Sequence, residues 1–210
     1  MKKEAITLQT KLARRVIRKA FFAPSDMITV AGVDTAYRQN RACAAVVVIS
    51  LEDLKIIEEV VAVKPARFPY IPGLLSIREG PVILEALSRL KAAPDVLMVD
   101  GHGIAHPRRF GLASHLGLFT GIPAIGCAKT RLIGEYEEPQ STRGSIANLT
   151  DEGETIGAVV RTRTGVKPVF VSIGHRINLD LCIRIVLKSC RGYRLPEPLR
   201  RADHLSRKKL

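Results

Sequence analysis

Cysteine is scarce in this sequence, whose 210 residues include only Cys43, Cys127, Cys182 and Cys190. No two of them form a CxxC pair, and each lies in an apolar run. This spacing argues against a disulfide framework and against a cysteine zinc site. We therefore expect four reduced thiols in the core of a cytosolic protein.

Long apolar runs are also missing. No segment reaches the ~18 consecutive apolar residues that a transmembrane helix needs. The N-terminal stretch MKKEAITLQTKLARRVIRKAFF is charged and has neither an uninterrupted apolar region nor a cleavage signal. The chain contains no internal repeat, low-complexity segment or flexible linker. We expect one cytoplasmic domain over residues 1–210, with no membrane partner.

Acidic residues are few compared with basic ones. The 20 Asp and Glu face 33 Lys and Arg, which gives a net charge of +13. Such a balance favours a polyanionic partner, nucleic acid above all, over a merely cation-rich surface of the kind found in some thermophile proteins. The hydrophobic fraction of 46% is enough for a substantial core.

Hydrophobic periodicity predicts an order of helices and strands. Leu8, Leu12, Val16 and Ala20 recur every four residues and indicate a basic amphipathic helix that ends near Pro24. The expected elements that follow are strands at 28–36, 42–50 and 56–63, a helix at 77–91, a strand at 95–100, a helix at 111–120, a strand at 123–128, strands at 154–163 and 169–174, and a helix at 179–188.

Short connections between the first three strands predict an antiparallel three-strand meander. Helices and strands then alternate, and right-handed crossovers place helices on the faces of the sheet. We expect a mixed α/β sheet flanked by helices. This order matches the ribonuclease H-like arrangement, in which carboxylates on the first strand and on the strand after the first helix lie side by side.

Four carboxylates stand where a metal-dependent nuclease would need them: Asp34, Glu79, Asp100 and Asp203. Buried carboxylates are costly unless they are paired or bind a metal. Mg²⁺ prefers such oxygen ligands, and two ions about 4 Å apart could clamp a phosphodiester. The first three have structural alternatives, a turn for Asp34, an Asx turn for Asp100 and a Ser76–Glu79 capping box. Asp203 could belong only to a charged terminal helix.

Three further groups could take part in chemistry. Lys129 follows a buried strand and could hold a phosphate oxygen, or could simply be solvated. His102 and His106 form HxxxH, but Gly103 and Pro107 argue against the helix that a zinc pair would need, so His106 is better suited to proton transfer. His175 is interpreted as a buried histidine with its hydrogen bonds satisfied.

A proline-rich segment, Pro69-Tyr70-Ile71-Pro72-Gly73, is the other unusual feature. Two prolines stiffen a loop that carries an aromatic and a β-branched side chain. Exposed, these side chains could enter a base stack and hold it open, as an enzyme that extrudes a base requires. The alternative is that Tyr70 packs into the core.

The blocks VAGVDTAY, FPYIPGLLSIREGP, VLMVDGHGIAHPRRFGLASHLG, IPAIGCAKTRL and VSIGHRINL together resemble the endonuclease V family over about residues 28 to 205. The resemblance implies a ribonuclease H-like fold, Mg²⁺ or Mn²⁺ as cofactor, and recognition of hypoxanthine in nucleic acid. It also implies hydrolysis of the second phosphodiester bond 3′ to the lesion. Departures from the family pattern are Thr35-Ala36 and Ile77, which leave every carboxylate intact.

The resemblance also assigns roles to residues. It makes the carboxylates of Asp34, Glu79 and Asp100 metal ligands, with Asp203 as a fourth acidic residue. His106 and Lys129 would assist at the scissile phosphate, and Tyr70 would fill the gap left by the flipped base. The base pocket would be shaped by Gly73, Leu75, Gly101, Gly103 and Leu132. We expect a monomer acting on deoxyinosine in DNA, with inosine-containing RNA as the nearest alternative and a non-catalytic nucleic-acid-binding protein as another.

Overall fold

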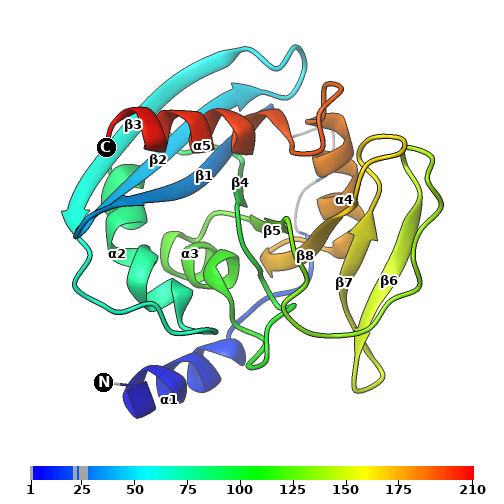
Figure 1. The fold of residues 1–210 in the computed structure, drawn as a ribbon, viewed down its shortest axis with the longest axis horizontal. Helices are drawn as coiled ribbons and strands as arrows, with labels where there is room; N and C mark the ends of the chain where they lie inside the picture. The colour runs from blue at the N-terminus through cyan, green and yellow to red at the C-terminus, as the bar shows by residue number, and fades with distance from the viewer. Residues whose placement is uncertain (1, 21–22, 24–27) are drawn as a thin grey trace.

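The structure, a computed structural model, describes residues 2–20, 23 and 28–210 (Figure 1). The helices are α1 (Lys2–Ala13), α2 (Leu75–Leu87), α3 (Leu112–Thr120), α4 (Leu179–Lys188) and α5 (Glu197–Lys208). The strands are β1 (Thr29–Arg38), β2 (Arg41–Ser50), β3 (Ile56–Pro65), β4 (Val96–Val99), β5 (Ala124–Ala128), β6 (Ile146–Asp151), β7 (Glu154–Val160) and β8 (Val169–His175).

All of these strands join one eight-stranded sheet in the order β3-β2-β1-β4-β5-β8-β7-β6. Strand β4 is parallel to both β1 and β5, whereas the other neighbours are antiparallel. The three-strand meander and the mixed α/β sheet predicted from the sequence are therefore confirmed. The meander β1–β3 forms one edge of the sheet, the crossovers through α2 and α3 build its centre, and the antiparallel strands β8, β7 and β6 form the other edge.

Two hydrophobic layers cover the two faces of the sheet, because alternate residues of each strand point to opposite sides. On one face, side chains such as Val30 and Met98 pack with Cys182 of α4 and Leu199 of α5. On the other face, side chains such as Val33 pack with residues of α2 and α3. All four cysteines are buried and free, as expected for reduced core thiols.

The N-terminal helix differs from its prediction. Helix α1 ends at Ala13, although the apolar spacing continues to Ala20. The later apolar residues serve another purpose, since Val16 and Ala20 pack against the core as non-helical chain. The Ile17 backbone is held there by His175, whose Nδ1 accepts the Ile17 N–H at 3.2 Å. That contact confirms His175 as a buried, satisfied histidine, while the predicted stop near Pro24 lies outside the described residues.

Helix α2 and strand β6 also differ from the prediction. Helix α2 covers Leu75–Leu87 rather than 77–91, and Ser88 ends it by occupying the C-cap. The edge strand β6 was not predicted at all. It forms a hairpin with β7 through Glu152 and Gly153, whose φ angles are 53° and 79°. Two consecutive positive φ angles are typical of a type I′ turn.

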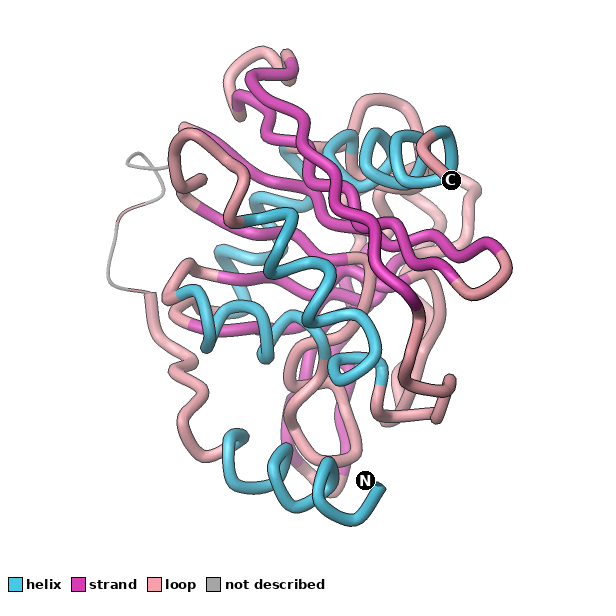
Figure 2. Tube along the Cα trace, turned by 90° about the vertical axis from the view of Figure 1, so that its left-hand side faces the viewer, coloured by secondary structure: helices cyan, strands magenta, loops and turns pink. Residues whose placement is uncertain are grey.

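The two terminal helices lie at opposite ends of the molecule. Helix α1 is at the bottom and α5 towards the top both in Figure 1 and in the perpendicular view of Figure 2. Helix α5 packs on β1 and β2. None of the helices among the described residues is long and apolar enough to cross a membrane.

Candidate active site

Asp34 and Asp100 lie side by side in the middle of the sheet. The parallel pairing of β1 with β4 runs up to Val33 opposite Val99, and the Asp100 N–H donates to the Val33 carbonyl at 3.0 Å. The two aspartates are therefore the next residues along adjacent strands, at the same depth. This confirms the sequence-based expectation that they would be neighbours.

Glu79 approaches from α2, where its side chain is only 7% exposed. The Tyr37 hydroxyl donates to Glu79 Oε1 at 3.2 Å. The capping-box interpretation is wrong, because the helix begins after Leu74 without any side-chain cap, and the Ser76 hydroxyl instead accepts a hydrogen bond from Gln9. The carboxylate of Glu79 therefore faces the sheet and not its own helix terminus.

Asp203 is held over β1 by an ordered helix and not by a loose tail. Glycine at position 32 makes this possible, since a Cβ atom there would lie 2.1 Å from the backbone of Pro198. The backbone of α5 therefore rests directly on β1, a close approach that glycine permits. Arg207 donates to Asp203 Oδ1 at 2.9 Å from the next turn of the helix.

Burial and mutual repulsion both disfavour the charged form of these carboxylates. Burial, followed by the charge of Asp100, raises the pKa of Asp34 to about 7. Burial, followed by the charge of Asp34, raises the pKa of Glu79 to about 8. Asp203 adds to the repulsion on Asp34. The cluster therefore holds more negative charge than its surroundings compensate.

Lys129, which directly follows β5, supplies one positive charge. Its Nζ lies 2.5 Å from Asp100 Oδ2. Burial works against the charged lysine, but the hydrogen bond to Asp100 and the charges of Asp100, Asp34 and Asp203 outweigh burial and raise the pKa of Lys129. Lys129 is thus an ion-pair partner within the cluster and not a solvated surface lysine.

The donor chemistry of this cluster fits a hard divalent cation. Carboxylate oxygens are the ligands that Mg²⁺ and Mn²⁺ prefer. Burial and the neighbouring carboxylates raise the pKa of Asp34 and of Glu79, and a cation between them would offset both effects. As the side chains of the described residues stand, no three Asp, Glu, His or Cys groups converge at metal-ligand spacing. In that arrangement the Lys129 ammonium group is bonded to Asp100 Oδ2, an oxygen that a cation would use as a ligand.

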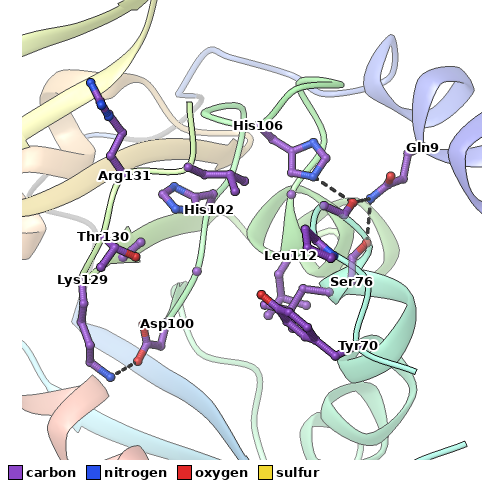
Figure 3. Close-up of a pocket in the computed structure, with 17 residues that line it drawn as sticks. Gln9, Tyr70, Ser76, Asp100, His102, His106, Leu112, Lys129, Thr130 and Arg131 are labelled. Carbon is purple, nitrogen blue, oxygen red and sulfur yellow. Dashed lines mark hydrogen bonds and ion pairs between the residues drawn. The ribbon is translucent and has the colours of Figure 1, made fainter. Parts of the chain in front are cut away.

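A cavity of about 380 Å³ opens beside the cluster, within the range of small-ligand sites. Figure 3 shows the Asp100–Lys129 pair at one end and Tyr70, Ser76 and Gln9 across the cavity. Of the residues predicted to shape a base pocket or support the chemistry, the cavity wall contains Tyr70, Pro72, Gly73, Leu75, Asp100, Gly101, His106, Lys129 and Leu132.

Other predicted residues lie outside this wall. Pro69 and Ile71 flank Tyr70 in the loop but do not line the cavity. Gly103 packs against β8, where its N–H donates to Ser172 Oγ at 2.8 Å and a Cβ would lie 1.9 Å from the Ile173 carbonyl oxygen. Asp34, Glu79 and Asp203 stand beyond the cavity, in the carboxylate cluster.

Tyr70 is exposed by 67%, so it does not pack into the core. The loop turns back at its base, where the Leu74 N–H donates to the Ile71 carbonyl at 2.9 Å. Gly73 adopts φ of +77°, a left-handed conformation that glycine tolerates well. The geometry presents an aromatic side chain at the edge of the cavity.

His106 has both ring nitrogens engaged. Its Nδ1 accepts the Arg108 N–H at 3.1 Å, so Nε2 carries the proton and donates to the Gly73 carbonyl at 3.0 Å. Burial lowers the pKa of His106 to about 4, which keeps the ring neutral near pH 7. The 101–111 segment is not helical, as predicted, and this hydrogen bonding leaves His106 no free nitrogen for a zinc pair with His102.

Two residues of the cavity wall have a place that the sequence did not predict: Gln9, which was not singled out, and His102, which was considered only for a zinc pair. Gln9 is 1% exposed and projects from the same face of α1 as the buried Ala5 and Leu12. A polar residue within an apolar stripe was the available signal. His102 has a buried Nδ1 with no hydrogen-bond partner, and burial lowers its pKa to about 4.

The mixed sheet with its meander, together with Asp34 within β1 and Asp100 directly after the adjacent β4, is that of a ribonuclease H-like nuclease. The chain belongs to the endonuclease V family, whose family model, described as Endonuclease V, matches residues 10–204. Members of this family are generally divalent-metal-dependent nucleases.

Individual endonuclease V sequences match nearly the whole chain. An endonuclease V from Methanothrix thermoacetophila is 52% identical over 206 residues, which is 98% of this chain and 91% of the relative. One from Roseiflexus sp. strain RS-1 is 50% identical over 203 residues, 97% of this chain and 90% of the relative.

Solved structures of endonuclease V have the same fold as this chain. The crystal structure of the Streptomyces avermitilis endonuclease V has a TM-score of 0.94 at 45% identity and covers 100% of this chain and 92% of its own. Another similar structure is that of a Ciona intestinalis endonuclease V in complex with a 23mer DNA containing an inosine followed by a ribo-adenosine. It has a TM-score of 0.89 at 30% identity, and the match covers 99% of this chain and 95% of the Ciona chain.

Proposed function

We propose that this protein is a repair endonuclease that recognises deoxyinosine in DNA. It hydrolyses the second phosphodiester bond 3′ to the lesion and leaves a 3′-OH and a 5′-phosphate. The observation that carries this proposal is the position of the cavity, which lies between the Asp100–Lys129 pair and the exposed Tyr70. A base held there has a carboxylate cluster on one side and an aromatic side chain on the other. The DNA in the Ciona intestinalis complex contains an inosine.

The carboxylates of Asp34, Glu79 and Asp100 would hold Mg²⁺, for which Mn²⁺ could substitute, and Asp203 would complete the acidic set. When bound, the cation supplies positive charge to the scissile phosphate. Asp34 and Glu79, with pKa values raised to about 7 and 8, are the groups that gain most from a nearby cation. The partly buried hydrogen bond from Tyr37 to Glu79 would orient the carboxylate that comes from α2.

Lys129 and His106 would assist from the cavity side. The ammonium group of Lys129 already lies within the cluster, so it can share its charge between Asp100 and a phosphate oxygen. Neutral His106 holds its Nε2 proton on the Gly73 carbonyl, so proton transfer to the leaving oxygen would require that hydrogen bond to open.

The base would sit among backbone groups and small side chains. Gly73, Leu75, Gly101 and Leu132 line the cavity that receives it, and Gly103 supports the same loop by packing on β8. Tyr70, flanked by Pro69, Ile71 and Pro72, would enter the stack that the base has left. The surplus of 13 positive charges would bind the phosphate backbone around the lesion.

One observation favours a second substrate, inosine-containing RNA. The DNA bound by the Ciona intestinalis relative carries a ribo-adenosine after the inosine. A 2′-hydroxyl contact next to the lesion would shift the preference of this protein towards RNA.

The test is a cleavage assay on matched oligonucleotides. Each contains one hypoxanthine in a DNA strand, in an RNA strand, or in DNA with one ribonucleotide after the lesion. We expect a nick one nucleotide beyond the lesion with Mg²⁺, lost with a chelator and lost in Asp34→Ala and Asp100→Ala variants that keep the fold. Cleavage by either variant would refute the ligand assignment.

The remaining outcomes separate the alternatives. A faster nick on RNA would identify an inosine-specific endoribonuclease. Tight Mg²⁺-independent binding without a nick on any strand would identify a non-catalytic nucleic-acid-binding protein. We also propose that the chain acts as a monomeric single domain, and a cleavage rate per molecule that is independent of protein concentration is the expected result.

A further inference from the structure

Gln9 lies where an amphipathic helix normally places an apolar residue. It is 1% exposed and shares the inner face of α1 with Ala5 and Leu12. Burying a side-chain amide is unfavourable unless its hydrogen bonds are made. The buried position of the Gln9 amide therefore needs an explanation in its hydrogen bonds and not in packing.

The amide of Gln9 joins three separate segments. Its Nε2 donates to the Gly73 carbonyl at 3.1 Å, to Ser76 Oγ at 3.1 Å and to the Phe110 carbonyl at 3.3 Å. Its Oε1 accepts the Arg108 Nε–H at 2.7 Å. These contacts connect α1 to the base of the Tyr70 loop, to the first turn of α2 and to the end of the 101–111 segment.

The Gly73 carbonyl is the common point of this network. Besides Gln9, it accepts from His106 Nε2 at 3.0 Å and from Arg108 Nη2 at 2.6 Å. Gly73 has φ of +77° and stands three residues after Tyr70. Fixing this carbonyl therefore fixes the direction in which the loop leaves its base. Figure 3 shows the dashed bonds of Gln9 and His106 meeting at one end of the cavity, opposite the Asp100–Lys129 pair.

Gln9 also lines the cavity, which raises the possibility that it contacts the base directly. The hydrogen-bond inventory argues against this. A glutamine amide has two N–H donors and one carbonyl oxygen. Here the two donors are shared among three acceptors, and the oxygen already accepts from the Arg108 guanidinium. The side chain is committed to the protein, so its effect on the ligand passes through Gly73 and the Tyr70 loop.

We propose that Gln9 is a positioning residue for lesion recognition, and that α1 is therefore part of the recognition apparatus. This inference rests on the proposed function, in which Tyr70 enters the base stack. By holding the Gly73 carbonyl with His106 and Arg108, Gln9 keeps the loop in the orientation that presents Tyr70. It has no hydrogen bond to the carboxylate cluster, and the bond from His106 to Gly73 does not require it, so its loss should act on recognition more than on hydrolysis.

The test replaces Gln9 by methionine, which has a similar length but makes none of the hydrogen bonds. We expect KM for the hypoxanthine substrate to rise on the order of tenfold, with kcat within about twofold, because all four hydrogen bonds of Gln9 are lost while His106 and Arg108 still hold the Gly73 carbonyl. Thr10→Ala is the matched control, since the Thr10 hydroxyl bonds only to the Ile6 carbonyl within the same helix. It should leave both constants unchanged.

A double-mutant cycle separates positioning from general stability. If Gln9 acts through Tyr70, the Gln9→Met/Tyr70→Ala variant should show no lower preference for lesion over ordinary DNA than Tyr70→Ala alone. Additive losses, or an equal loss on both DNAs, would refute the proposal. Should Gln9→Met fail to fold, Arg108→Met removes the neighbouring donor to Gly73 and should give the same loss of preference.

The outcomes also distinguish this inference from the proposed function. If the unaltered protein shows no preference for hypoxanthine, the proposed function fails and the inference with it. If the unaltered protein shows the preference and Gln9→Met and Arg108→Met both retain it in full, only the role of Gln9 is refuted.

Discussion

The close contact between β1 and α5 yields the most demanding prediction. In Gly32→Ala the added Cβ would lie 2.1 Å from the carbonyl carbon and oxygen of Pro198 and 2.7 Å from the Leu199 nitrogen. All three atoms belong to the backbone, so no side-chain rotation relieves the overlap. Ordinary contacts begin at about 3.4 Å, so α5 would have to move away by about 1.3 Å.

Two consequences of different size follow from that shift. Overpacking a buried site destabilises proteins by roughly 1–3 kcal/mol, and a backbone clash of this kind should lie at the upper end. Asp203 moves with α5, and a displacement of about 1 Å at a reacting centre can cost about a hundredfold in rate. We expect Gly32→Ala to lower the melting temperature and to lower kcat about a hundredfold.

The assay measures thermal unfolding and single-turnover cleavage of a hypoxanthine oligonucleotide. Gly165→Ala is the control for stability, because no atom lies within 4 Å of the added Cβ and only the φ of +72° is strained, at a cost of about 1 kcal/mol. It should lower the melting temperature and keep the cleavage rate. Unchanged cleavage in a folded Gly32→Ala variant would refute the argument that the seating of α5 sets the position of Asp203.

Three further predictions concern the loop, the charge and the buried histidines. Tyr70→Ala should reduce nicking at the lesion about tenfold more than it reduces binding to ordinary DNA, because Tyr70 is 67% exposed and free of core packing; equal losses would exclude a wedge. DNA binding should weaken steeply with salt, given the net charge of +13, and a flat response would mean that the basic surface does not contact phosphates. Burial lowers the pKa of His115 from its ordinary value near 6.5 to about 4. Between these pH values the unfolded chain binds more protons than the folded protein does. The free energy of unfolding should therefore fall as the pH drops from about 6.5 to 4. His115 should contribute up to about 3 kcal/mol of this loss. The loss should therefore shrink in His115→Leu but not in His204→Gln, a change on the exposed side of α5. Melting curves over a pH series would show this, and identical pH profiles for all three proteins would contradict it.

Local sequence signals predicted the centre of the fold well. The apolar runs of the meander and of β4 and β5 are unambiguous because buried strands carry little else, and their order determines that Asp34 and Asp100 become neighbours. The turn between β6 and β7 carries a weaker signal. The Glu152-Gly153 pair marks the β6–β7 hairpin, but β6 is a partly exposed edge strand without a strong apolar pattern.

The failures share a physical cause, namely tertiary contacts that local patterns do not contain. The spacing from Leu12 to Ala20 predicts one helix, but Val16 and Ala20 pack on the core after α1 has ended, with the intervening Ile17 bonded to His175. Ser76 and Glu79 have the spacing of a capping box, yet each finds a partner from another segment, Gln9 and Tyr37. In each case the competing contact lies more than 40 positions away along the chain.

The seating of α5 on β1 also bears on the order of folding. Asp34 and Asp203 are separated by 169 positions, so the complete acidic cluster depends on one of the most non-local contacts in the chain. Closing so large a loop costs entropy before any contact compensates for it, and such contacts tend to form late. A chain that has folded only as far as α4 would have the sheet, the cavity and three of the carboxylates. It would lack Asp203 and the α5 backbone that packs on Gly32. Nuclease activity should therefore appear during refolding only after the sheet has formed, as a slower phase that follows the docking of the last helix.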